Sequence, residues 1–127
     1  MKILLCEDYS SFAKMASEIL SAASFPVTRV TVNGHTSLLA VRENDWDVVI
    51  TDYDLGFGPN GDDVAAEALN ADTPLVVLWS SVPRDYPGEV KQSSKDNPHF
   101  RLLEKSQTRE VVRLLGKLKE QQDDDGA

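Results

Sequence analysis

Residues 47–56, DVVITDYDLG, place two carboxylates directly after a run of strand-forming residues. The run is apolar and β-branched, which is typical of strands that are covered on both faces in a parallel sheet. Asp52 and Asp54 follow at the point where the strand should end. Two such carboxylates repel each other unless a positive charge compensates them. The stretch therefore predicts a buried strand with a charged site at its carboxyl end.

Runs of strand length recur along the chain, and helical patterns separate them. The expected strands are residues 2–6, 27–32, 47–51, 75–79 and 100–104. The expected helices are residues 10–23, 36–44, 62–70 and 108–122. This alternation predicts an α/β fold, in which a doubly wound parallel sheet carries its ligand site beyond the carboxyl ends of the strands.

Residues 81–98 interrupt the alternation where a fourth helix should lie. They contain three prolines and a glycine and show no clear apolar stripe, so they leave room for a turn or two of helix around residues 88–95. The polar, acidic residues 123–127 are expected to form a disordered tail.

Composition excludes several classes of function. The chain has 127 residues, enough for one core, and its net charge of -8 argues against nucleic acid as a ligand, because phosphate binding needs clustered Lys and Arg. No run approaches the roughly 18 apolar residues of a membrane span, and the first residues do not read as a secretory signal. The single cysteine, Cys6, lies in an apolar run and should be a buried, reduced thiol. We therefore expect a cytoplasmic protein that binds neither nucleic acid nor membranes.

Polar side chains follow four of the expected strands. In a doubly wound sheet these positions face one crevice, where Glu7, Asp8, Asp52, Ser80 and Lys105 should meet. Three crowded carboxylates would raise one another's pKa unless a cation neutralised them, and Mg²⁺ suits carboxylates while leaving positions for phosphate oxygens. Lysine and serine can bind phosphoryl oxygens, and a neutralised aspartate can attack phosphorus. The sequence thus predicts phosphoryl transfer onto Asp52.

The order and spacing of LLCED, DVVITDYDLG, PLVVLWSS and LLEKS resemble the receiver domain of two-component response regulators over residues 1–122. The resemblance implies a flavodoxin-like fold of five βα units with a degenerate fourth helix. It also implies that Asp52 accepts a phosphoryl group from a histidine kinase or phosphotransfer protein. As a stand-alone receiver, the protein would signal through contacts with a downstream protein and would not turn over a metabolic substrate.

The resemblance also assigns roles to the other residues of the crevice. Ser80 would be the switch hydroxyl, and Lys105 would bind the phosphoryl group. The residues implied to hold Mg²⁺ are Asp8, Asp52, Glu7 directly or through water, and Asp54 through its backbone carbonyl. The Asp54 side chain is either a surface carboxylate without a role or a neighbour of the water that hydrolyses the phosphoryl group.

The chain departs from the family pattern at several positions. Serine follows Lys105 where the family has proline after a cis peptide bond, so the sequence leaves the state of that bond open. Leu102 replaces the aromatic residue that normally accompanies the switch hydroxyl. Because Trp79 precedes two serines, Ser80 is the expected switch residue and Ser81 the reserve.

Two other functions are compatible with parts of the pattern. A receiver-like interaction module that is never phosphorylated would explain the poor fourth helix and the missing proline. DYDLG also resembles the start of haloacid-dehalogenase-type phosphatases, but that family places the motif on its first strand, whereas here LLCED comes first.

Overall fold

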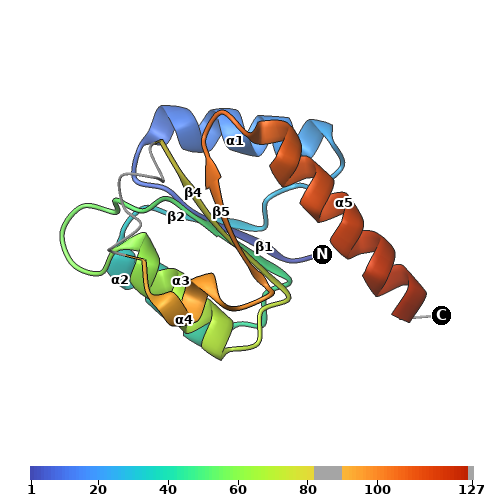
Figure 1. Ribbon diagram of the computed structural model, residues 1–127. Coiled ribbons are helices and arrows are strands. Elements are labelled where there is room, and N and C mark those ends of the chain that lie inside the picture. The colour runs from blue at the N-terminus through green and yellow to red at the C-terminus, as the bar shows by residue number, and fades with distance from the viewer. Residues whose placement is uncertain (82–89, 126–127) are drawn as a thin grey trace.

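Figure 1 shows the computed structural model, which describes residues 1–81 and 90–125. The strands are β1 (Ile3–Cys6), β2 (Arg29–Thr31), β3 (Val48–Thr51), β4 (Leu75–Ser80) and β5 (Phe100–Glu104). The helices are α1 (Ser10–Ala22), α2 (Gly34–Glu43), α3 (Gly61–Asn70), α4 (Gln92–Lys95) and α5 (Thr108–Asp125). Within the described ranges the strands form one parallel sheet in the order β2-β1-β3-β4-β5. This arrangement confirms the predicted doubly wound, flavodoxin-like α/β fold.

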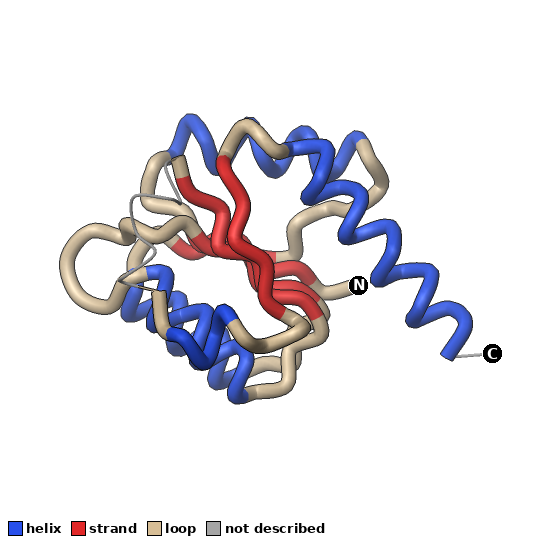
Figure 2. Tube along the Cα trace, viewed as in Figure 1, coloured by secondary structure: helices blue, strands red, loops and turns tan. Residues whose placement is uncertain are grey.

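Both faces of the sheet are covered, by α1 and α5 on one side and by α2, α3 and α4 on the other (Figures 1 and 2). Successive side chains of a strand point to opposite faces. In β3, Val48 and Ile50 therefore join the core beneath α1 and α5, whereas Val49 joins the core beneath α2 and α3. In β4, Val77 and Trp79 lie on the α1 and α5 side. The uninterrupted apolar runs of the central strands are explained by this burial on both faces.

Strand β2 lies at the edge of the sheet and is shorter than the expected range of residues 27–32. It pairs only with β1, from Leu4 opposite Arg29 to Cys6 opposite Thr31. Because β1 ends at Cys6, the ladder cannot extend further along the β-branched run. The end of the neighbouring strand thus sets the end of β2 at Thr31.

Helix α4 is a single turn, in agreement with the short helix expected around residues 88–95. Much of the proline-rich stretch, residues 82–89, lies outside the described residues, so the expectations for that part are not addressed by the structure. The short α4 nevertheless lies against the same face of the sheet as α2 and α3 (Figure 1).

Helix α5 continues to Asp125, beyond the end expected at residue 122. Residues 123–125, expected to belong to a disordered tail, are therefore helical. Lys119 and Asp123 pair at 3.6 Å across one turn, which favours helix at these positions. Residues 126 and 127 are outside the described part of the chain.

Two further expectations concern the membrane and the thiol. Among residues 1–81 and 90–125, no helix combines the length and apolar character needed to cross a membrane. Cys6 is a free thiol and is fully buried, as expected from its apolar run.

Candidate functional site

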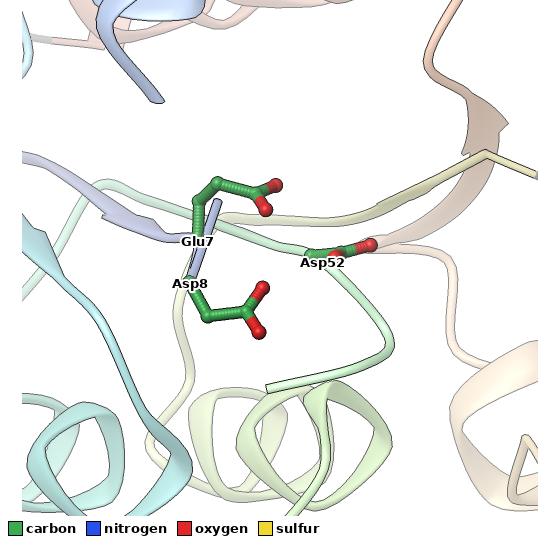
Figure 3. A group of neighbouring side chains, drawn as sticks. All are labelled: Glu7, Asp8 and Asp52. Carbon is green, nitrogen blue, oxygen red and sulfur yellow. The ribbon is translucent and has the colours of Figure 1, made fainter. Parts of the chain in front are cut away.

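The carboxyl ends of β1 and β3 lie side by side and bring three carboxylates together. Cys6 pairs with Thr51 in register, and the Asp52 backbone N–H donates to the Cys6 carbonyl at 2.9 Å. The next residues, Glu7 and Asp8 after β1 and Asp52 after β3, are therefore level with one another. One oxygen from each of the three carboxylates lies within 4.8 Å of the others, and the side chains point into the same space (Figure 3).

Lys105 reaches the same place from the end of β5. Its backbone N–H donates to the Ser80 carbonyl at 2.8 Å, which fixes the start of the loop after the strand. Its Nζ lies 3.0 Å from Glu7 Oε2 and 3.6 Å from Asp52 Oδ2. The Lys105 side chain is only 17% exposed, so its ammonium is held between the two carboxylates with little access to water.

Burial dominates the electrostatics of this group. It raises the pKa of Glu7 to about 7; the charge of Asp52 adds to the rise, and Lys105 opposes it. Burial also raises the pKa of Asp52, against the lowering effect of Lys105 and of the Tyr53 N–H that Asp52 accepts. The nearby Asp8 adds to the rise for Asp52. The Lys105 ammonium thus does not fully offset the cost of ionising the buried carboxylates of Glu7 and Asp52.

The donor set fits a divalent cation. Three carboxylates and one ammonium leave an excess of negative charge in a partly buried cluster. Mg²⁺ is a hard cation that prefers oxygen ligands and typically uses one or two carboxylates together with water. Glu7, Asp8 and Asp52 offer oxygens of that kind at one point (Figure 3).

The Asp54 side chain does not join this group. Its carboxylate accepts from the Gly56 N–H at 3.0 Å and so stabilises the loop that leads to α3. That loop returns closely to the site, because the Gly61 N–H donates to the Tyr53 carbonyl at 2.7 Å. A Cβ at position 61 would lie 1.7 Å from the Asp52 carbonyl oxygen, so only glycine fits there. Helix α3 therefore begins directly against the backbone of Asp52.

No family model matches this chain, and no curated protein matches it in sequence. Solved structures do match it. The receiver domain of the putative response regulator NarL from Mycobacterium tuberculosis is 25% identical, with a TM-score of 0.73 over 93% of this chain and 95% of that one. A response regulator receiver protein from Sinorhizobium medicae is 24% identical, with a TM-score of 0.74 over 93% of both chains. A CheY-like receiver domain from Methylobacillus flagellatus is 18% identical, with a TM-score of 0.72 over 93% of this chain and 98% of that one.

The chain has the receiver-domain fold. The predicted likeness to response regulator receivers is confirmed over most of the chain. Within this receiver fold, Glu7, Asp8, Asp52 and Lys105 come together as the sequence predicted. Ser80 is the last residue of β4 and is buried, and its carbonyl binds the backbone of Lys105.

An aromatic pair next to Lys105 was not identified from the sequence. The Lys105 Nζ lies 4.1 Å from the centroid of the Phe12 ring. Phe12 packs edge-on against Trp79, with centroids 5.1 Å apart and an interplanar angle of 72°. The Trp79 indole N–H donates to the Glu104 carbonyl at 2.8 Å. Nothing in an apolar helical stripe or a strand run shows which of its residues will border a lysine.

Trp79 also occupies a notable position on β4. Thr51 pairs with Leu78, so the residue level with Asp52 on the neighbouring strand is Trp79. Its side chain belongs to the core on the α1 and α5 face of the receiver fold and is fully buried. The described residues contain no cis peptide bond, so the bond between Lys105 and the following serine is trans.

Proposed function

We propose that this protein is a response regulator receiver that accepts a phosphoryl group on Asp52 from a histidine kinase or phosphotransfer protein. It would then signal in the cytoplasm by changing its contacts with a downstream protein. The observation that carries the proposal is the meeting of three carboxylates from β1 and β3 with the Lys105 ammonium, 3.6 Å from Asp52. The receiver-domain fold supports it.

Asp8, Asp52 and Glu7 would hold Mg²⁺, together with the backbone carbonyl of Asp54. The ion would supply positive charge that offsets the repulsion between the Asp52 carboxylate and the oxygens of an incoming phosphoryl group. Lys105 carries a second positive charge on the same side of Asp52, where it can bind a phosphoryl oxygen. Ser80 would supply a hydroxyl at the end of β4.

The reaction is a displacement at phosphorus. An Asp52 oxygen attacks the phosphorus of a phosphohistidine, a P–O bond forms, and the P–N bond breaks. The ring nitrogen of the donor keeps the electron pair of that bond and takes a proton from solvent. Attack of water on the resulting acyl phosphate releases inorganic phosphate and restores the Asp52 carboxylate. The protein thus takes part in its own phosphorylation and dephosphorylation without a metabolic substrate.

A phosphorylation-independent interaction module is the second candidate, and one observation favours it. The residue level with Asp52 on β4 is the fully buried Trp79, and the hydroxyl residue proposed as the switch, Ser80, comes one position later. A bulky ring at this level leaves less freedom for movement of β4 toward a phosphoryl group on Asp52.

Intact-mass measurement separates the two candidates. The purified protein is incubated with phosphoramidate and Mg²⁺, and one added phosphoryl group is the expected result. Asp52→Asn and excess EDTA should each abolish the gain, whereas Asp54→Asn should retain it, because the Asp54 carboxylate is engaged with the Gly56 N–H. Absence of the gain in the wild-type protein, with this donor and with a histidine kinase, would favour the interaction module.

A further inference from the structure

The Lys105 side chain is positioned by contacts other than those of the residue that follows it. In the receiver family a proline follows this lysine, and here the chain has serine. The Lys105 backbone is anchored through the Ser80 carbonyl, but a lysine side chain has four rotatable carbon–carbon bonds. The position of its ammonium therefore depends on the groups that surround it.

Among residues 1–81 and 90–125, three groups surround the ammonium. The Lys105 Nζ lies 3.0 Å from the Glu7 carboxylate, 3.6 Å from the Asp52 carboxylate and 4.1 Å from the centroid of the Phe12 ring. The negative potential of an aromatic face attracts a cation at this distance, and the attraction is stronger where water is excluded. With its side chain 17% exposed, Lys105 is such a case.

The Phe12 ring is itself fixed from behind. Phe12 lies in the first turn of α1, and its ring meets Trp79 edge-on at 5.1 Å. Trp79 is 1% exposed and is tied by its indole N–H to the Glu104 carbonyl, on the residue directly before Lys105. The backbone before the lysine and the ring beside its ammonium are therefore held by the same indole.

We propose that Phe12, braced by Trp79, is a positioning residue that holds the Lys105 ammonium between Glu7 and Asp52. It acts through Lys105 and does not itself contact the reacting atoms. The inference rests on the proposed function where it concerns phosphorylation, because the ammonium is then held ready for a phosphoryl oxygen on Asp52. The placement of Lys105 against the ring is testable without any phosphorylation.

The first test is spectroscopic. Protons on the Lys105 Cε, next to the ring face, should show an upfield ring-current shift in NMR spectra of the metal-free protein. Phe12→Leu should remove the shift, and Phe12→Tyr should retain it because the ring is kept. Met15→Leu, at an exposed position of the same helix, is the matched control and should leave it unchanged. An unshifted Lys105 signal in the wild-type protein, or one that Phe12→Leu leaves unchanged, would overturn the placement.

The second test measures the rate of phosphorylation by phosphoramidate. Replacing Phe12 with phenylalanines of increasing ring fluorination weakens the negative potential of the face while keeping its shape. The rate should fall progressively, by about threefold to tenfold over the series, with Mg²⁺ affinity unchanged. A rate that does not vary across the series contradicts the positioning role. If the wild-type protein is not phosphorylated at all, the proposed function and the positioning role in it both fail, whereas the NMR shifts still decide where Lys105 lies.

Discussion

The buried carboxylate of Glu7 makes the metal-free protein sensitive to pH, and Glu7→Gln should remove that sensitivity. The pKa of Glu7 rises from its ordinary value of 4.5 to about 7 in the folded protein. Below pH 4.5 the folded and unfolded chains both hold the proton, so Glu7 does not affect stability. As the pH rises to about 7 the unfolded chain loses the proton first, and the folded state becomes less stable.

The size of the effect follows from the two pKa values of Glu7. At about 1.4 kcal/mol for each pH unit, a rise of the pKa from 4.5 to about 7 corresponds to roughly 3 kcal/mol at pH 8. Glutamine resembles the protonated acid at every pH. Glu7→Gln should therefore raise the free energy of unfolding by roughly 3 kcal/mol at pH 8 but by only about 1 kcal/mol at pH 5.

Urea denaturation at the two pH values, in the presence of EDTA, measures this difference. Glu18→Gln changes the same charge at an exposed position of α1 and serves as the control, with no expected gain at either pH. Mg²⁺ should stabilise the wild-type protein at pH 8 and so narrow its gap to Glu7→Gln, because a ligand that binds only the folded state stabilises it. A gain that is the same at pH 5 and pH 8, or a Glu7→Gln protein less stable than wild type at pH 8, would refute the reasoning.

Three further predictions concern the surroundings of the site. Gly61→Ala should lower the free energy of unfolding by about 1–3 kcal/mol, because the alanine Cβ would lie 1.7 Å from the Asp52 carbonyl oxygen. An unchanged midpoint of urea denaturation would contradict this contact. Lys91→Met should cost about 1 kcal/mol at pH 7, since the half-exposed Lys91 Nζ lies 3.3 Å from the Asp62 carboxylate and 3.1 Å from that of Asp63, and high salt should shrink the loss; equal losses at low and high salt would argue against an electrostatic cause. Burial raises the pKa of the Cys6 thiol, so a thiol reagent should modify it only in denaturant, and rapid labelling of the folded protein would show that it is accessible.

The sequence was informative where a residue pattern has one structural solution. In a doubly wound parallel sheet the acids that follow the strands meet at one edge, so the grouping of Asp8 with Asp52 was predictable. The approach of Lys105 was predictable for the same reason. Strand β2 was predicted too long, and its carboxyl end follows from where β1 ends and not from its own β-branched residues.

The parts that were missed depend on contacts between elements far apart in the chain. Trp79 is buried in the core and Phe12 is partly buried against it, but their contact with each other and with Lys105 depends on how α1 packs across β4 and β5. A pattern of apolar and polar residues along the chain does not show how a helix packs across a sheet. The Asp54 carboxylate accepts a hydrogen bond from the Gly56 N–H, a common turn interaction that engages this side chain away from the other carboxylates.

The close seating of α3 on Asp52 also makes the connecting loop a suitable place for engineering. Both ends of the loop are pinned, at Asp52 and at Gly61, while Gly56 and Gly58 adopt positive φ angles of 78° and 90° and display a fully exposed Phe57 between them. Because each doubling of loop length costs only about 0.6 kcal/mol, a few inserted residues at this tip would leave the anchored ends where they are. A fluorophore attached there would be carried by a loop that begins at Asp52 and would report on the movement of that loop without touching the core.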